Sequence, residues 1–240
     1  MHRLGHTRSV SRRDHLLQTP DTFVRIPLPC LERATAVVHT GTAAGAAFTE
    51  YTVELEAGGV LSGVGLQRFT YVLEGELTMQ APGREEPMLA GAFAYVPGSV
   101  THRFIAANGG RAVVIERQLN GRETALVVGH EEECAAVALM GDEGIQVRSL
   151  MPGGAEFDFV VNTMVYQPGA ALGMVEVHVM EHGLLMLEGG GIYRLGEEWH
   201  SVAAGDFIWM APFCPQWFGA IGKTPAKYLI YKDWNQHPIR

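Results

Sequence analysis

The sequence predicts an all-β fold built from many short strands. Its 240 residues include 29 glycines and 12 prolines, and much of the glycine lies between short apolar runs, as in chains of strands joined by turns. Residues 47–57 alternate, with Tyr51, Val53 and Leu55 on one face and polar side chains on the other. No apolar run reaches the ~18–20 residues of a membrane-spanning helix. A β-sandwich or β-barrel is therefore expected.

Charge and cysteine content narrow the partners and the compartment. The formal net charge is −8, whereas nucleic acids and anionic membranes bind cationic surfaces, so we expect neither as a partner. The first 15 residues are polar and lack the apolar segment of a secretory signal. Three widely spaced cysteines, Cys30, Cys134 and Cys214, fit a reducing compartment. We therefore expect a cytoplasmic protein.

Two segments recur at one spacing, which indicates an internal duplication. Residues 67–75 (QRFTYVLEG) match 181–189 (EHGLLMLEG), and 91–104 match 205–218. Both pairs are offset by 114 residues (75 to 189, 104 to 218), and two matches at one offset are improbable by chance. The sequence therefore predicts an arm over 1–33, a first barrel over 34–140 and a second barrel over 141–240.

The stretch 173–191 (GMVEVHVMEHGLLMLEGGG) concentrates residues that can bind a metal ion. Glu176 and His178 are two residues apart and would share one face of a strand, while His182 would open the next strand on a largely apolar face. A carboxylate and two imidazoles in an apolar shell suit a divalent metal. Taken alone, a buried Glu-x-His pair is more commonly a hydrogen-bonded structural pair.

The repeat predicts that the two barrels differ in chemistry. Opposite the ligand-type residues of the second half, the first half has Ser62, Val64, Arg68 and His102. At most one of these is a metal ligand, so we expect a degenerate, metal-free first barrel. His102 is then expected to be an ordinary hydrogen-bonded histidine.

These motifs resemble those of a bicupin, a chain with two jelly-roll β-barrels. The first cupin motif has the form Gly-x-x-Glu176-x-His178-x3-His182-x6-Gly189, with Glu and His exchanged relative to the usual order, and Gln216 stands where the second motif usually has histidine. This variant set resembles the (S)-ureidoglycine aminohydrolases of allantoin catabolism. The similarity covers most of the chain and is strongest over 176–235.

The resemblance implies an enzyme with a defined set of site residues. It implies Mn²⁺ bound by residues matching Glu176, His178, His182 and Gln216. It also implies substrate-contacting or catalytic residues matching Tyr193, Tyr228 and Lys232, with Glu176 acting beyond ligation. The implied reaction releases ammonia from (S)-ureidoglycine and gives (S)-ureidoglycolate.

Several alternatives stay open from the residues themselves. Lys232 shares a strand face with Tyr228 and Ile230, but a surface lysine is the ordinary outcome. Tyr193 could be a half-buried core residue. The ligand set would also serve a cupin dioxygenase with Fe²⁺, or the chain could be a non-catalytic bicupin that binds a small ligand.

The edges of the predicted sheets favour association. Edge strands expose unpaired backbone groups that need to be covered, and the arginine-rich arm needs a surface to lie against. We therefore expect a homo-oligomer, with the arm lying across the body or a partner subunit. An arm that covers its own barrel, or a partly disordered terminus, is the alternative.

Overall fold

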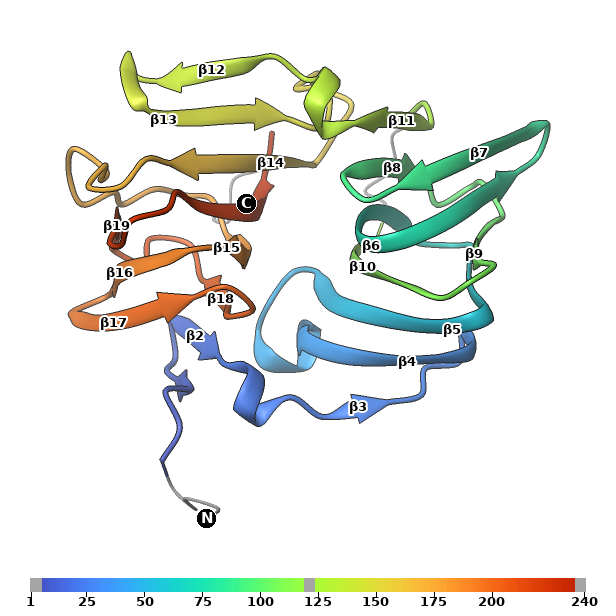
Figure 1. Cartoon of the computed structure of the whole chain (residues 1–240), viewed down its shortest axis with the longest axis horizontal. Coiled ribbons are helices and arrows are strands. Elements are labelled where there is room, and N and C mark those ends of the chain that lie inside the picture. Colours follow the sequence, from blue (N-terminus) through green and yellow to red (C-terminus); the bar gives the residue numbers. More distant parts are fainter. Residues whose placement is uncertain (1–5, 119–123, 236–240) are drawn as a thin grey trace. The chain divides into compact units, whose positions relative to one another are not determined.

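The computed structural model describes residues 6–118 and 124–235 as a chain of strands with short turns (Figure 1). The only helical elements in these ranges are three single 3-10 turns, η1 (Pro20–Thr22), η2 (Thr42–Ala44) and η3 (Glu131–Glu133). The predicted all-β fold is confirmed. Among the described residues there is no helix of the length and apolarity needed to cross a membrane.

The chain divides into two compact units, which we call the first and second barrel. The first barrel comprises Val24–Cys134 with Gly154–Phe157. The second barrel comprises the described residues up to Phe23, then Ala135–Gly153 and those from Asp158 onward. The two units are therefore not two consecutive halves of the sequence, because the N-terminal strands belong to the barrel that the C-terminal half forms.

The first barrel is one continuous nine-stranded sheet in the order β11-β8-β6-β10-β5-β4-β3, with β7 paired to β6, and β9 paired to β5 and β6. Its strands are β3 (Arg25–Ile26), β4 (Leu31–Thr40), β5 (Thr49–Gly63), β6 (Gln67–Ala81), β7 (Arg84–Leu89), β8 (Ala92–Val96), β9 (His102–Ala106), β10 (Gly110–Arg117) and β11 (Val127–His130). The two 15-residue strands β5 and β6 each pair with different neighbours at their two ends, which makes the sheet continuous. Gly75, with φ +80°, lies where β6 changes partner.

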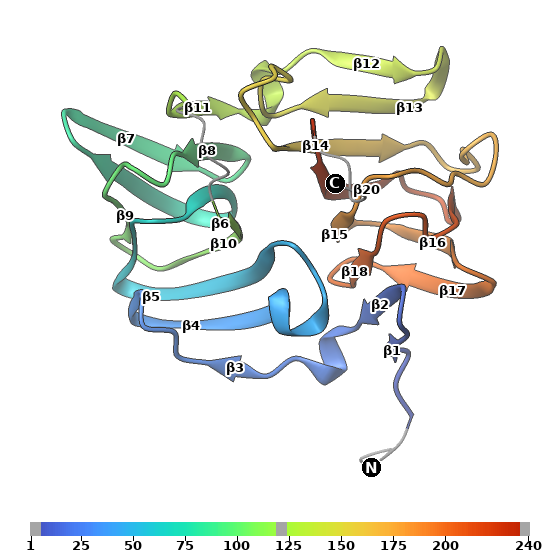
Figure 2. The ribbon, with the colours of Figure 1, turned by 180° about the vertical axis from the view of Figure 1, so that it is seen from behind.

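The second barrel has two sheets, an eight-stranded one in the order β1-β2-β18-β15-β20-β14-β13-β12 and a three-stranded one in the order β17-β16-β19. Its strands are β1 (Val10–Ser11), β2 (His15–Gln18), β12 (Ala136–Leu139), β13 (Asp142–Ser149), β14 (Phe159–Tyr166), β15 (His182–Glu188), β16 (Gly190–Leu195), β17 (Glu198–Ala203), β18 (Phe207–Met210), β19 (Gln216–Ala220) and β20 (Ala226–Asp233). Figure 2 shows β16, β17 and β18 from behind.

The two barrels differ where the repeat places the metal motif. Gly189, with φ +63°, separates β15 from β16 at the position of Gly75, so the counterpart of the long β6 is split. The counterpart of β5 ends at Tyr166, and residues 167–181 keep only two isolated bridges, Ala171 to Gly219 and Glu176 to Gln216. The regular strand expected for Glu176 and His178 is therefore absent, whereas His182 opens β15 as predicted.

The described part of the arm is built into the barrels by strand pairing. Strand β2 pairs antiparallel with β18, His15 opposite Met210, while β3 pairs with β4 of the first barrel. Two arginines of the arm add ion pairs, Arg8 to Asp206 and Arg12 to Glu198. The N-terminal segment thus covers an edge of its own chain.

Candidate metal centre and active site

Two irregular segments meet to form the candidate site in the second barrel. The backbone N–H of Glu176 donates to the carbonyl of Gln216 at 2.8 Å, and the N–H of Gln216 donates back to Glu176 at 2.9 Å. The N–H of Phe213, a residue with φ +64°, donates to the carbonyl of His178 at 2.8 Å. These bonds hold the segment that carries Glu176 and His178 against the segment that carries Gln216, although neither is a long strand.

All four predicted metal ligands converge around one ring nitrogen. Nε2 of His178 lies 3.2 Å from Nε2 of His182, 2.8 Å from Nε2 of Gln216 and 3.8 Å from Oε2 of Glu176. The two imidazoles meet edge to face, with ring centroids 4.7 Å apart. The sequence placed these residues in one site, and the structure brings them together.

The hydrogen bonds around the imidazoles suit a cation between them. Nδ1 of His182 lies 3.2 Å from the carbonyl of Tyr231, which accepts a hydrogen bond from the Nδ1–H and leaves Nε2 with its lone pair. Burial, aided by the positive charge of Lys232, lowers the pKa of His182, so the ring is neutral at pH 7. A neutral imidazole whose second nitrogen is held by a carbonyl is the usual form of a histidine metal ligand.

Gln216 presents its amide to both sides of the site. Its Oε1 accepts a hydrogen bond from the Tyr193 hydroxyl at 3.2 Å, and its Nε2 is directed at His178. A metal binds an amide through oxygen, so ligation by Gln216 requires this amide to turn over, and the Tyr193 hydroxyl can then accept from the amide nitrogen. The tyrosine can therefore support either orientation.

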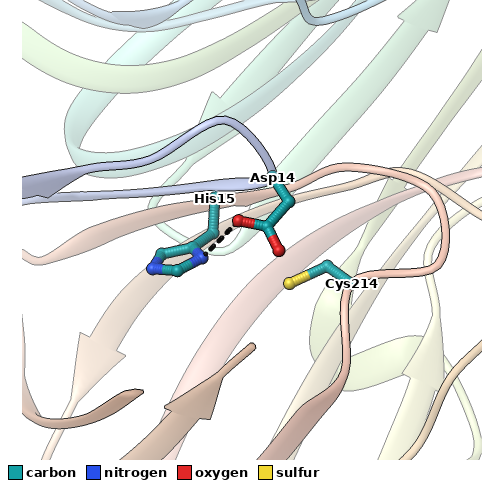
Figure 3. Close-up of side chains that lie close together, drawn as sticks. All are labelled: Asp14, His15 and Cys214. Atoms are coloured by element: carbon teal, nitrogen blue, oxygen red, sulfur yellow. Dashed lines mark hydrogen bonds and ion pairs between the residues drawn. The ribbon is translucent and has the colours of Figure 1, made fainter. Parts of the chain in front are cut away.

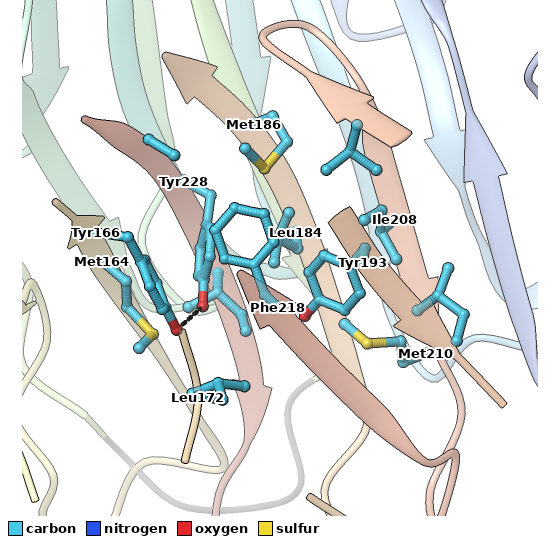
Figure 4. Close-up of a cluster of buried hydrophobic side chains, with 14 of the residues drawn as sticks. Met164, Tyr166, Leu172, Leu184, Met186, Tyr193, Ile208, Met210, Phe218 and Tyr228 are labelled. Carbon is cyan, nitrogen blue, oxygen red and sulfur yellow. Dashed lines mark hydrogen bonds between the residues drawn. The ribbon is translucent and has the colours of Figure 1, made fainter. Parts of the chain in front are cut away.

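Buried aromatic side chains adjoin the site through the bond of Tyr193 to Gln216. Tyr193 and Tyr228 are buried in one cluster with Phe218, and the Tyr228 hydroxyl shares a 2.8 Å hydrogen bond with Tyr166 (Figure 4). Burial raises the pKa of all three tyrosines, and the charge of Glu176 contributes in the same direction. They are therefore neutral hydroxyl groups that can donate or accept hydrogen bonds near Glu176.

Lys232 lies on the barrel-facing side of β20. It is directly opposite His182 in the β15–β20 register, and opposed residues project to the same face of a sheet. The two preceding residues on that face, Tyr228 and Ile230, are buried in the core cluster. Desolvation lowers the pKa of the half-buried Lys232, while the charge of Glu176 opposes that shift. The surface alternative for Lys232 does not fit this position.

Some residues that shape the site were not identified from the sequence. Tyr166 ends β14 and bonds Tyr228, and its place after Met164 on the alternating run of β14 is the signal that could have found it. Glu181 is buried, and its carboxylate accepts a 2.7 Å hydrogen bond from the Trp209 indole. That bond fixes the residue next to His182.

The equivalent place in the first barrel is filled by an ion pair. Nε of Arg68 donates to Glu116 at 2.8 Å, and Nη1 contacts the carbonyl of Ser62 and Nε2 of His102, both at 3.0 Å. Nδ1 of His102 donates to the carbonyl of Val100 at 2.8 Å, so His102 is the hydrogen-bonded histidine that the sequence predicted. A pocket of about 850 Å³ lies beside Arg68 and His102.

Comparison with known proteins gives one consistent family. The cupin domain model matches residues 51–116 and 162–231. A protein of Oryza sativa subsp. japonica described as a probable (S)-ureidoglycine aminohydrolase is 39% identical, over 98% of this chain and 78% of the relative. The (S)-ureidoglycine aminohydrolase of Arabidopsis thaliana is 38% identical, over 98% of this chain and 80% of its own.

Solved structures agree with the duplicated architecture. The crystal structure of a putative glyoxylate-induced protein from Pseudomonas aeruginosa superposes with a TM-score of 0.87 at 26% identity, covering 99% of this chain and 94% of the other. With two cupin matches in an almost entirely β chain, the predicted bicupin fold is confirmed.

Proposed function

We propose that this chain, which belongs to the cupin family and to the (S)-ureidoglycine aminohydrolases, uses Mn²⁺ to release ammonia from (S)-ureidoglycine, giving (S)-ureidoglycolate. Membership of this group makes the chain an enzyme and a hydrolase. The metal, the substrate and the stereochemistry of the product are the parts we propose.

One observation carries this proposal: two imidazole nitrogens, a carboxylate and an amide converge beside a half-buried lysine. The donor set is mixed nitrogen and oxygen without a thiolate, which suits Mn²⁺, Fe²⁺ or Zn²⁺. Cys214 is no competitor, because burial raises the pKa of its thiol to about 11 and a metal binds the thiolate. When bound, the metal would chelate the substrate and polarise it as a Lewis acid.

The residues around this donor set have roles that follow from their charge and position. Lys232 lies opposite the candidate ligand His182 in the β15–β20 register, and its ammonium would bind the substrate carboxylate, which also offsets the cost of burying the ammonium. The hydroxyls of Tyr193 and Tyr228 would orient the ureido group by hydrogen bonds. Holding the substrate in one pose determines which face of its α-carbon water can reach.

The proposed reaction exchanges one bond at the α-carbon. The C–N bond to the amino group breaks, a C–O bond to water forms, and the amine departs as ammonia after gaining a proton. Glu176 is the carboxylate in the site that can take a proton from water, and Lys232 is the group that can return one. Their proximity is indicated by the influence of Glu176 on the pKa of Lys232.

The test is metal-dependent ammonia release from freshly generated (S)-ureidoglycine. Metal-stripped protein is reloaded with Mn²⁺, Fe²⁺ or Zn²⁺, and ammonia, ureidoglycolate configuration and oxygen uptake are measured together. We expect ammonia with Mn²⁺ and the S product without oxygen uptake. Oxygen uptake with Fe²⁺ and no ammonia would instead support a cupin dioxygenase, and no turnover with any metal would support a ligand-binding bicupin.

We also propose that the chain works as a cytoplasmic homo-oligomer. No disulfide joins its three cysteines, which fits a reducing compartment. The edge strand β12 and the turn after it carry exposed apolar side chains, with Val137 62% and Met140 90% exposed, and edge strands are common sites of association. Sedimentation at the 26.1 kDa mass of one chain would contradict the oligomer.

A further inference from the structure

We propose that His15, His200 and Glu198 form a second divalent-metal site in the second barrel, suited to Zn²⁺ and sharing no residue with the candidate centre at Glu176. One ring nitrogen of each histidine and a carboxylate oxygen of Glu198 lie within 4.8 Å of one another. Two imidazoles and one carboxylate are a frequent zinc ligand set, with water in the fourth position.

Both histidines have a buried nitrogen that needs a partner. Nε2 of His15 and Nε2 of His200 are inaccessible to solvent and have no hydrogen-bond partner among residues 6–118 and 124–235. His15 is only 3% exposed, so water cannot freely satisfy its ring. Buried polar atoms are nearly always paired, and an unpaired one is a sign of a missing ion or water. A cation between the two rings would satisfy both.

Asp14 prepares His15 for this role. Nδ1 of His15 lies 3.0 Å from Oδ1 of Asp14, and Figure 3 shows Nε2 on the opposite side of the ring, directed away from Asp14. A carboxylate that accepts a hydrogen bond from Nδ1–H leaves the lone pair on Nε2 and makes that nitrogen a better ligand. Burial, with a further contribution from His15, lowers the pKa of His200, which favours the neutral ring that a metal requires.

Glu198 supplies the negative charge and a route for the ion. Its Oε2 lies 3.6 Å from Nε2 of His200, close to the roughly 3.4 Å between neighbouring ligands of a tetrahedral zinc ion. Arg12 donates to Oε1 at 2.7 Å and to Oε2 at 3.2 Å, so it orients the carboxylate but leaves a lone pair on Oε2. The side chain of Glu198 is 39% exposed, which gives an ion access from solvent.

A neighbouring cluster is the competing arrangement. Asp14, His15 and Cys214 also lie within metal-binding distance, on the Nδ1 side of the ring (Figure 3). In that cluster Nδ1 already bonds Asp14, and the Cys214 thiol is held protonated by burial. The thiol donates instead toward the carbonyl of Pro215 at 3.7 Å. The Nε2 side is therefore the better site.

The position of the site suggests what the ion does. His15 belongs to β2 of the large sheet, whereas Glu198 and His200 belong to β17 of the small sheet. A shared ion would fasten the N-terminal arm to β17, adding to the Arg12–Glu198 pair. A metal bound by residues distant in sequence stabilises the folded chain, because those ligands are not assembled in the unfolded one.

The test uses the full chain with the catalytic centre disabled. The His178→Ala/His182→Ala variant is stripped of metal and titrated with Zn²⁺ or Co²⁺ alone. We expect one ion per chain, with visible Co²⁺ absorption bands of a nitrogen-ligated site. Adding His200→Ala should abolish that binding, and Asp14→Asn should weaken it about ten- to hundredfold.

The controls separate this site from its competitor and from misfolding. Cys214→Ala should keep the ion, and Glu198→Gln, which preserves shape, should weaken binding. Circular dichroism verifies that each variant is folded. A folded His178→Ala/His182→Ala protein that binds no ion would overturn the proposal, as would binding that survives both His200→Ala and Glu198→Gln or is lost only in Cys214→Ala.

Discussion

The two barrels repeat one architecture but fill the same position with opposite chemistry. In the second barrel, His182 is opposite Lys232 across the β15–β20 ladder, and Glu176 and Gln216 complete the group. In the first barrel, Arg68 is opposite Glu116 across the β6–β10 ladder. The second barrel thus places a neutral imidazole beside the cationic Lys232, whereas the first barrel places the cationic Arg68 beside the anionic Glu116.

The arginine in the first barrel contacts the counterparts of the metal ligands. Arg68 donates to the carbonyl of Ser62, the counterpart of Glu176, and contacts Nε2 of His102, the counterpart of Gln216. Its guanidinium is a permanent cation attached to the chain, and Glu116 neutralises it. The first barrel thus has a permanent positive charge of its own at the position where the second barrel groups its candidate ligands, and we continue to expect it to be metal-free.

The largest expected effect comes from removing the imidazoles of the second barrel. His178→Ala or His182→Ala should each strip manganese and reduce ammonia release to the level of metal-free protein, because each removes one of few strong ligands. Metal analysis and an activity assay check this. His102→Ala is the matched control in the first barrel and should retain manganese. Either second-barrel variant with full metal and turnover would refute the assignment.

The next effect breaks the ion pair of the first barrel. Arg68→Met leaves Glu116, only 13% exposed, without its cation and should reduce the free energy of unfolding by about 3–5 kcal/mol. Denaturant titration measures this, and manganese content should stay unchanged.

The double variant Arg68→Met/Glu116→Leu tests the cause of that loss. Replacing both charges by apolar groups of similar volume should recover most of the stability, since the unpaired carboxylate is then absent. A double variant as unstable as the single one would show that packing, and not charge, sets the cost.

A smaller expected effect belongs to the lysine of the second barrel. Lys232→Ala should leave the fold and manganese intact but lower kcat by on the order of a hundredfold, as for a lost acid–base group, which corresponds to about 2.7 kcal/mol. KM should rise too if the ammonium binds the substrate carboxylate. Lys227→Ala is the control, because Lys227 lies on the same strand but is opposite Glu188, and not opposite His182, in the β15–β20 ladder. Unchanged kinetics in manganese-loaded Lys232→Ala would return this lysine to a structural role.

Much of this comparison was predictable from the sequence, because it depends on repetition and alternation. The 114-residue offset identified the duplicated barrel, and the replacement of His182 by Arg68 in the alignment identified the asymmetry. The alternation of Tyr228, Ile230 and Lys232 predicted their shared face, which the core packing of the first two confirms. Repetition and alternation can both be detected in the sequence of a single chain.

The parts that sequence reasoning missed depend on pairing between distant segments. Residues 167–181 were expected to include a strand through Glu176 and His178, but no strand pairs along them apart from two single bridges. Strands β1 and β2 are only two and four residues long, and the partner of β2, β18, is almost 200 residues away, so no local pattern revealed them. No sequence pattern predicted the ion pair of Arg68 with Glu116, because these residues meet only through the pairing of β6 with β10.

The smallest expected effect is a pH dependence confined to the first barrel. Burial, together with the positive charge of Arg68, lowers the pKa of His102 to about 4, although its bond to the carbonyl of Val100 opposes the shift. Between the ordinary value near 6.5 and 4, the unfolded chain binds a proton at this histidine and the folded chain does not. The contribution of neutral His102 to stability is therefore complete above pH 6.5 and declines as the pH falls toward 4.

Comparison of wild type with His102→Gln isolates this effect, because the variant mimics Gln216 and does not titrate. His39 and Glu50, whose pKa values burial shifts to about 3 and about 8, are present in both proteins and cancel. Between pH 7 and pH 4, wild type should lose on the order of 2 kcal/mol of unfolding free energy relative to the variant, less than the full shift implies because solvent lies near the ring. Denaturant midpoints at several pH values measure the difference. Parallel pH profiles would mean that His102 has the same pKa in the folded and unfolded chain, so the ring would be protonated in the folded barrel below about pH 6.5 and could not then accept from the guanidinium of Arg68.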